Sequence, residues 1–393
     1  MKKFTTLLTT SIILIATSCF GQVVQKASIS GTRDAAVCFN IGDKVYMGGG
    51  IRHKDFWEYT PATDTWVQKN DLPGIIKNRA FGIGLTVNGI AYVGMGSDNS
   101  ELKYDLWQYN PVTDSWIQKA DYPGDSPTAC AFFSVNNKIY LVGGANDVTA
   151  TEKIYEYDPV TDKWRVLEGA GYPEAQVFFA TGFSIGNFGY VTCGSGQSEF
   201  KSTFRFNPID ESWLQVASFP GTERQAAVSF VIGELAYVGG GQKAFTEAFK
   251  DFYRYNPANN TWASVGEIGD KARAWGVATS VNGKGYVGSG WDFGSTFFDD
   301  WWEFTPQNIT SVNSIDNTAA THYYNFENQQ WFLHKDDDGL STMKIIDISG
   351  KTILQADFEG NDKTVDVHAL NCGIYFIEIK SQTNVWREKF MVR

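Results

Sequence analysis

One short phrase recurs along most of this chain, and it limits the possible folds more than any other feature of the sequence. An aromatic and a polar residue precede a proline, and a tryptophan follows five residues later. The tryptophans of successive copies are 50, 48, 49 and 49 residues apart. A period near 49 indicates an array of similar units, each burying its apolar face against its neighbours. The complete copies are Tyr59-Thr60-Pro61 with Trp66, Tyr109-Asn110-Pro111 with Trp116, Tyr157-Asp158-Pro159 with Trp164, Phe206-Asn207-Pro208 with Trp213, and Tyr255-Asn256-Pro257 with Trp262.

Each copy is preceded by a β-rich run that ends in glycine, at residues 45–50, 91–96, 139–144, 189–194, 236–241 and 285–290. Turns such as Pro111-Val112-Thr113-Asp114 suit a tight connection between two strands. The first strand of each unit is rich in small residues, which a crowded central axis requires. These small residues are Ala35, Ala36, Gly82, Gly84, Ala129, Ala131, Ala226, Ala227, Gly276 and Ala278.

A period near 50 with glycine clusters, a Tyr-x-Pro turn and a distant tryptophan resembles the kelch repeat, in which each copy forms one four-stranded blade of a β-propeller. The resemblance implies an all-β fold with a six-bladed kelch β-propeller over residues 22–309. A sixth copy begins at Phe304-Thr305-Pro306 and lacks its tryptophan strand. Residues 23–32 read like residues 213–222, so we expect the N-terminal segment Val23 to Ser28 to pair beside residues 300–304 and close the ring. Closure removes exposed sheet edges.

The C-terminal part of the chain has a different pattern. Residues 310–317 are polar and are interpreted as a linker. Alternating segments at 343–348, 364–367 and 374–379 then predict a small β-sandwich over residues 318–393. The Gly350-Lys351 hairpin, the Leu370-x-x-Gly373-x-Tyr375 step and the basic end Lys389-Phe390-Met391-Val392-Arg393 resemble the C-terminal sorting domain of the bacterial type IX secretion system. The resemblance implies an immunoglobulin-like sandwich that engages the type IX secretion machinery. An unrelated immunoglobulin-like module is the alternative.

The first residues have the pattern of a secretory signal. Lys2 and Lys3 precede a short apolar run, and residues 1–21 are predicted to be a signal peptide. Residues 16–19 also weakly resemble a lipoprotein signal with Cys19 as the lipidated residue. The run is too short to cross a bilayer, so no transmembrane segment is expected after signal removal.

Composition limits the partners. The formal net charge is −11 and the pI is about 4.9, which argues against a nucleic-acid-binding surface. The four cysteines beyond Cys19 are widely spread and are expected to be free thiols, because they show neither paired nor metal-ligand spacing. We expect no cofactor and no metal site.

Four arginines occupy one equivalent position at the start of the innermost strand, and they fall on neighbouring blades once the ring closes. In the kelch resemblance this position opens on the ligand-binding face, where arginine binds carboxylate or phosphate bidentately. The alternative is that the repeat favours arginine for hydrogen bonds between blades. The four are Arg33, Arg79, Arg224 and Arg273, and the other two blades have Pro127 and Val177 there.

Two residues after this position lie Phe81, Phe179 and Trp275, which are predicted to offer a stacking surface, with core packing as the alternative for the two phenylalanines. Phe81 and Trp275 join the four arginines as predicted ligand-binding residues. The segment 291–298 is unusually aromatic, which indicates either recognition or packing against the tail.

Signals of catalysis are weak. The propeller segment contains one histidine, His53, so the copper site of the galactose oxidases, which resemble kelch proteins, lacks its histidine pair. Six-bladed kelch propellers also resemble N-acetylneuraminate epimerases, and Glu223 beside Arg224 is the candidate acid/base residue of that chemistry. An exposed loop carboxylate is the simpler interpretation of Glu223.

We therefore expect a secreted or cell-surface binding module for an anionic glycan or an extracellular protein. A carbohydrate epimerase or mutarotase is the alternative from another class. A surface-layer or adhesion component without a small ligand is the third.

Overall fold

The structure is a computed structural model, and it describes residues 21–75, 77–98, 101–146, 148–169, 171–306, 320–325, 330–335, 339–347, 350–360, 362–366, 370, 373–380 and 385–392. Gln22–Thr305 forms one compact unit, and the strands beyond it belong to a second. The two units are described separately. Within these residues, no helix is long and apolar enough to span a membrane.

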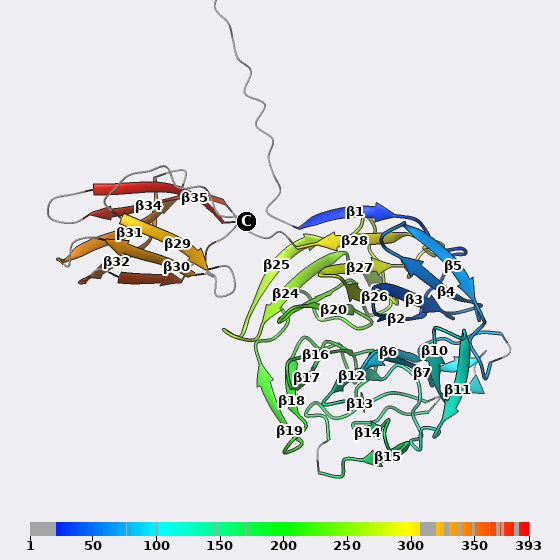
Figure 1. The fold of residues 1–393 in the computed structure, drawn as a ribbon. Coiled ribbons are helices and arrows are strands. Elements are labelled where there is room, and N and C mark those ends of the chain that lie inside the picture. The colour runs from blue at the N-terminus through cyan, green and yellow to red at the C-terminus, as the bar shows by residue number, and fades with distance from the viewer. Residues whose placement is uncertain are drawn as a thin grey trace, which may run out of the picture. The chain divides into compact units, whose positions relative to one another are not determined.

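The first unit is a ring of six four-stranded antiparallel sheets, the blades of a β-propeller (Figure 1). From inside to outside, the blades are β2 (Val37–Ile41), β3 (Lys44–Gly48), β4 (Phe56–Thr60), β5 (Thr65–Lys69); β6 (Ile83–Val87), β7 (Ile90–Gly94), β10 (Leu106–Asn110), β11 (Ser115–Lys119); β12 (Ala131–Val135), β13 (Lys138–Val142), β14 (Ile154–Asp158), β15 (Lys163–Val166); β16 (Thr181–Ile185), β17 (Phe188–Thr192), β18 (Thr203–Asn207), β19 (Ser212–Val216); β20 (Val228–Ile232), β21 (Leu235–Gly239), β24 (Asp251–Asn256), β25 (Thr261–Glu267); and β26 (Val277–Val281), β27 (Lys284–Gly288), β28 (Trp301–Thr305), β1 (Gln22–Lys26). We number these blades one to six in that order.

Blades two and five each carry an added two-stranded hairpin between their second and third main strands. These hairpins are β8 (Ser97–Asp98) with β9 (Glu101–Leu102), and β22 (Gln242–Lys243) with β23 (Glu247–Ala248).

The last blade closes the ring as predicted. Strand β1 pairs antiparallel with β28, from Gln22 opposite Thr305 to Lys26 opposite Trp301, and Figure 1 shows the blue first strand beside the yellow last one. Ala27, the residue after β1, makes two hydrogen bonds to blade one, and equivalent bonds join other neighbouring blades. The Ala27 N–H donates to Asp64 at 2.9 Å, and the Trp66 indole donates to the Ala27 carbonyl at 2.8 Å.

The same pair of bonds recurs at two further junctions between blades, so Trp66, Trp164 and Trp262 each donate to the blade before their own. Ala120 is bonded to Asp162 and Trp164 in this way, and Ala217 to Asn260 and Trp262. Strand β1 therefore takes the place of the missing sixth tryptophan strand, although Val23 occupies the position of the tryptophan.

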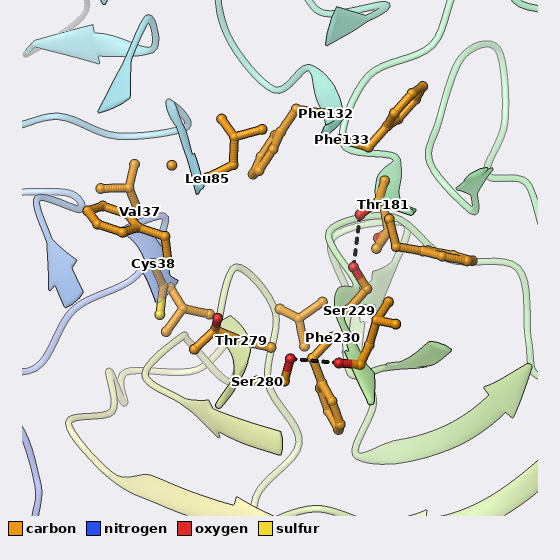
Figure 2. A pocket seen from close by; sticks show the side chains of 18 of the residues that line it. Val37, Cys38, Leu85, Phe132, Phe133, Thr181, Ser229, Phe230, Thr279 and Ser280 are labelled. Atoms are coloured by element: carbon orange, nitrogen blue, oxygen red, sulfur yellow. Dashed lines mark hydrogen bonds between the residues drawn. The ribbon is translucent and has the colours of Figure 1, made fainter. Parts of the chain in front are cut away.

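A central cavity of about 380 Å³ runs between the six innermost strands (Figure 2). Small residues line it, as predicted: a Cβ on Gly84 would lie 2.9 Å from the Val37 Cβ. Side-chain hydroxyls bridge neighbouring inner strands, as in the bonds from Ser184 to the Ser134 carbonyl at 2.6 Å and from Ser280 to the Val231 carbonyl at 2.6 Å. No charged side chain lines this cavity among the described residues.

The second unit contains two antiparallel sheets. One has the order β29 (Ala320–Asn325), β30 (Gln330–Lys335), β33 (Asp362–Asp366), and the other β32 (Thr352–Phe358), β31 (Ser341–Asp347), β34 (Gly373–Lys380), β35 (Val385–Val392). Val365 of the first sheet and Met343, Ile345 and Ile377 of the second share one core, so the sheets pack face to face. The Gly350 N–H donates to the Asp347 carbonyl in the predicted Gly-Lys hairpin.

Two predicted segments fall outside this description. The predicted linker lies outside the described residues, and so does the signal peptide apart from Gly21. Cys38, Cys130 and Cys193 are free, as expected, and Cys372 also lies outside the described residues.

Candidate ligand-binding site at the mouth of the propeller

Six equivalent residues, one from each blade, form a ring at the end of the cavity where the innermost strands begin. We call this ring the mouth. Main-chain N–H groups donate to the carbonyl of the preceding blade's residue at five of the six steps, with N to O distances of 2.8 to 3.1 Å. All six residues have φ between 50° and 57°, a left-handed conformation that non-glycine residues rarely adopt. The mouth residues are Ala35, Phe81, Ala129, Phe179, Ala226 and Trp275.

Alanines and aromatic residues alternate around the mouth. Because every second residue is an alanine, the three rings of Phe81, Phe179 and Trp275 have room to meet over the cavity. Their centroids lie 5.2, 5.3 and 5.9 Å apart. Phe81 and Trp275, two of the predicted ligand-binding residues, are thus in direct contact, and each is only partly buried.

Five further rings extend this contact set toward blade six and the hairpin of blade five. We call the eight rings the aromatic cluster. None of them is fully buried, and Phe245 at the tip of the β22–β23 hairpin is 54% exposed. The cluster comprises Phe81, Phe178, Phe179, Phe245, Trp275, Trp291, Phe293 and Phe297.

Part of the cluster is a row of nearly parallel rings. Trp291 stacks on Trp275 with centroids 5.6 Å apart and on Phe297 at 5.8 Å, with interplanar angles of 20° and 11°. The loop that presents Trp291 and Phe297 is held by Asp292, whose Oδ1 accepts the N–H of Gly294 at 2.8 Å and of Thr296 at 3.2 Å. The rings are therefore fixed before any ligand arrives, which lowers the entropy cost of binding.

The four predicted ligand-binding arginines lie elsewhere, inside the blades. Each is at most 1% exposed. Each guanidinium donates two hydrogen bonds to one aspartate, with N to O distances of 2.6 to 3.1 Å. The bonded pairs are Arg33–Asp55, Arg79–Asp105, Arg224–Asp251 and Arg273–Asp300.

This geometry corrects the predicted role of Arg33, Arg79, Arg224 and Arg273. A buried guanidinium already bound bidentately has no free edge for a ligand's carboxylate. The alternative interpretation, that the repeat favours arginine for structural hydrogen bonds, fits these contacts, but the side chains do not bond between blades. The side-chain bonds run within one blade, whereas the main chain of the same position links blades, as in the bond from Gly50 N–H to the Arg79 carbonyl at 2.7 Å.

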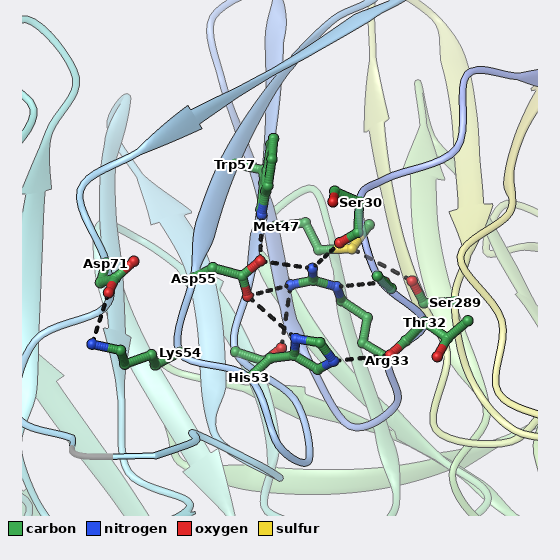
Figure 3. A network of polar contacts seen from close by, with 12 residues as sticks. Ser30, Thr32, Arg33, Met47, His53, Lys54, Asp55, Trp57, Asp71 and Ser289 are labelled. Atoms are coloured by element: carbon green, nitrogen blue, oxygen red, sulfur yellow. Dashed lines mark hydrogen bonds and ion pairs between the residues drawn. The ribbon is translucent and has the colours of Figure 1, made fainter.

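The Arg33 pair shows how tightly such a carboxylate is held (Figure 3). Asp55 accepts two bonds from Arg33 and one from the Trp57 indole at 2.6 Å, and His53 lies 3.6 Å away. Burial alone would raise the pKa of Asp55, but the hydrogen bonds from His53 and Arg33 lower it well below its usual range. His53, the one propeller histidine, is thus held in this contact set, where its Nε2 lies 2.9 Å from the Thr32 carbonyl oxygen.

Glu223 is partly buried, with a side chain 38% exposed, and it forms ion pairs with Lys201 at 3.2 Å and Lys243 at 3.4 Å. A hydrogen bond from its own backbone, together with Lys201, holds the pKa of Glu223 below its usual range. An acid/base catalyst that works near neutral pH needs the opposite shift. The exposed-carboxylate interpretation of Glu223 fits this environment better than the catalytic one.

Asp34, which sequence reasoning missed, lies beside the mouth residue Ala35. It is 2% exposed, and its Oδ2 has no hydrogen-bond partner among the described residues. Burial raises the pKa of Asp34 to about 6, against the opposing effect of Arg52 and His53. The signal was available in the sequence, because no other blade has a charged residue at this position.

Reactive thiols and metal-ligand clusters are not found in the described part of the chain. Burial raises the pKa of both Cys130 and Cys193 to about 12, so neither is a nucleophile at neutral pH. No three His, Cys, Asp or Glu side chains of the described residues gather as a metal site.

Comparison with known proteins assigns both units. Residues 127–169, which contain blade three, match the kelch motif, and residues 325–393 match the secretion system C-terminal sorting domain. A solved structure titled "Structure of YjhT" is similar in fold with a TM-score of 0.60 at 18% identity, covering 70% of this chain and 95% of that one. No curated protein sequence matches the chain.

A C-terminal sorting domain of this kind indicates export, with secretion or attachment at the cell surface, and contact with the secretion machinery. The repeat, the six blades and the matched tail all point to one description. The chain is a secreted or cell-surface kelch-type β-propeller followed by a sorting domain of the type IX secretion system.

Proposed function

We propose that this protein is an extracellular binding module that holds a glycan on the aromatic cluster at the mouth of the propeller. The observation that carries the proposal is the cluster itself: eight partly exposed rings in mutual contact at one end of the cavity. Groups of exposed apolar side chains this large commonly mark binding sites on soluble proteins.

The chemistry of the cluster suits a sugar. One face of a pyranose presents C–H groups of partial positive charge, and the face of an aromatic ring is negative, so the two stack. Within the row of Trp275, Trp291 and Phe297 the rings lie face to face, so a sugar would meet the exposed edges of the row, whose partial positive charge attracts its oxygens. Beside the row, the ring of Phe245 is 54% exposed and can take a stacked sugar. Polar groups at the edge of the cluster, such as Arg52 and the Lys243–Glu223 pair, are available for sugar hydroxyls.

An epimerase is less well supported, because Glu223 is paired with two lysines and its pKa is lowered, whereas proton transfer near neutral pH needs a raised pKa. The proposal also includes the predicted signal peptide at residues 1–21, which would carry the chain across the inner membrane before the tail directs it outward.

A glycan array probed with the purified chain tests the proposed function. We expect a defined set of glycans to bind, and Trp291→Ala to weaken the best of them roughly tenfold or more, because the middle ring of the row is lost. Trp291→Phe keeps a ring and should retain most of the affinity.

Phe376→Ala is the matched control, because Phe376 is an exposed ring of the tail unit, 40% accessible. It should bind glycans like the unchanged protein. If no glycan binds, or if Trp291→Ala and Phe376→Ala bind equally well, the aromatic cluster is not a glycan site.

A further inference from the structure

A fifth arginine, which the repeat alignment did not single out, lies at the end of the aromatic row. Arg52 is exposed, and its guanidinium carbon lies 5.4 Å from the centroid of the Phe297 ring. Since Phe297 stacks on Trp291 and Trp291 on Trp275, the guanidinium is the last member of a row of four planar groups.

Arg52 is held in place by an unusual backbone. Its φ is 74°, in the left-handed region that residues other than glycine rarely adopt. In blade one the next residue, His53, is bound at Thr32 and beside Asp55, which fixes the chain just after Arg52. A strained residue at the edge of a binding surface is a common sign of function.

The guanidinium is also unpaired. Among the described residues, Arg52 donates no hydrogen bond and forms no ion pair, in contrast to the four buried arginines, each bound to its aspartate. Asp34 and Arg52 interact electrostatically, but they form no ion pair. The Asp34 Oδ2 has no hydrogen-bond partner among the described residues. The charge of Arg52 is therefore not neutralised within the protein.

Stacking determines what Arg52 can recognise. A ring against one face of the guanidinium leaves its N–H groups pointing outward in the plane, in the fork that matches the two oxygens of a carboxylate. A sugar ring packed against the exposed edges of Phe297 and Trp291 would bring a carboxylate on its own edge level with that fork.

We propose that Arg52 binds the carboxylate of an acidic sugar whose ring packs against the exposed edges of the Trp275–Trp291–Phe297 row. This rests on the proposed function and narrows it, because it makes the preferred glycan a uronic acid or another carboxylated pyranose. The anion is recognised by this exposed arginine, two residues after the glycine cluster Gly48-Gly49-Gly50, and not by the buried arginines.

The test uses acidic trisaccharides of galacturonic, glucuronic and mannuronic acid, each titrated calorimetrically beside its methyl ester. Esterification removes the negative charge and keeps the ring. We expect at least one acid to bind roughly ten- to a hundredfold more tightly than its ester. Arg52→Gln should remove that difference by weakening the acid and leaving the ester unchanged, and Arg52→Lys should restore only part of it.

Lys271→Gln is the matched control, because Lys271 is an exposed cation whose Nζ lies 4.9 Å from the Phe298 ring centroid, outside the row. It should leave the acid preference intact. Equal binding of acid and ester, or equal weakening of both by Arg52→Gln, would overturn the inference and leave the glycan proposal standing. Binding of neither form in any pair, with Trp291→Ala also without effect on the array, would overturn both.

Discussion

At the scale of single residues, arginine occurs in two different environments in this propeller, and burial separates them. Arg33, Arg79, Arg224 and Arg273 are buried with an aspartate partner, whereas Arg52 is exposed without one. The repeat position alone could not show this, because it gives the location of a side chain and not its partner.

A signal for the buried pairs was nevertheless present in the sequence. The blades with arginine have an aspartate at the start of the third strand, and the blades with Pro127 and Val177 have Lys153 and Ser202 instead. This co-occurrence within one chain predicts an ion pair. The aromatic residues were found by the alignment, but their contact could not be predicted, because it depends on the alternation with alanine around the ring.

Removing a buried arginine should therefore damage stability rather than binding. Arg273→Gln leaves Asp300, 3% exposed, without its cation, and we expect a loss of about 3 to 5 kcal/mol in the free energy of unfolding. Burial would raise the pKa of Asp300, but Arg273 lowers it, so the carboxylate is charged at neutral pH. Urea unfolding measures the effect.

Arg52→Gln is the control for this experiment. We expect its unfolding free energy within about 0.5 kcal/mol of the unchanged protein, as for an exposed substitution. A similar small loss for Arg273→Gln would show that its ion pair is not structural.

At the scale of elements, the closing strand is the part of the fold best predicted from sequence. The similarity of residues 23–32 to residues 213–222 placed Ala27 at the position of Ala217, and both residues make the same bonds to the next blade. The two hairpins β8–β9 and β22–β23 were not predicted. They lie in the loops between the second and third main strands. These loops differ in length from blade to blade, so the repeat pattern does not predict their structure.

Loss of β1 should open the ring. Deleting residues 22–28 exposes the edge of β28 and leaves the Trp66 indole and Asp64 without Ala27. We expect the urea midpoint to fall markedly and the protein to associate through the free edge, as seen by size-exclusion chromatography with light scattering.

Point substitutions on β1 and just after it provide the comparison. Ala27→Pro removes the N–H that bonds Asp64 and should reproduce part of the loss, while Val24→Ala, at a side chain 38% exposed, should have little effect. A deletion variant as stable and monomeric as the full chain would mean that β1 does not hold the ring closed.

At the scale of the whole molecule, the chain combines a β-propeller, for which we propose glycan recognition, with a C-terminal sorting domain. Sequence motifs identified the tail because short features such as Gly350-Lys351 and Gly373-x-Tyr375 recur in order in the sorting family, and the match at residues 325–393 agrees. The ligand is harder to predict, since one propeller fold carries many functions and only the residues at the mouth differ.

Because the propeller and the sorting domain are separate units, the effect of removing the tail can be predicted. A chain that ends at residue 317 should fold, because Gln22–Thr305 is a compact unit of its own, yet remain in the periplasm. Fractionation of cells that use type IX secretion, with the full chain as control, measures this. Delivery of the shortened chain to the surface would contradict the role of the tail.

The most direct test of the central claim is a crystal structure of the chain with its tightest-binding glycan from the array. The account predicts a sugar ring packed against Trp291 and its neighbours in the aromatic cluster, with an acidic group, where one is present, at the guanidinium of Arg52. A glycan bound at the outer edges of the blades or at the opposite end of the central cavity, with the aromatic cluster empty, would contradict it.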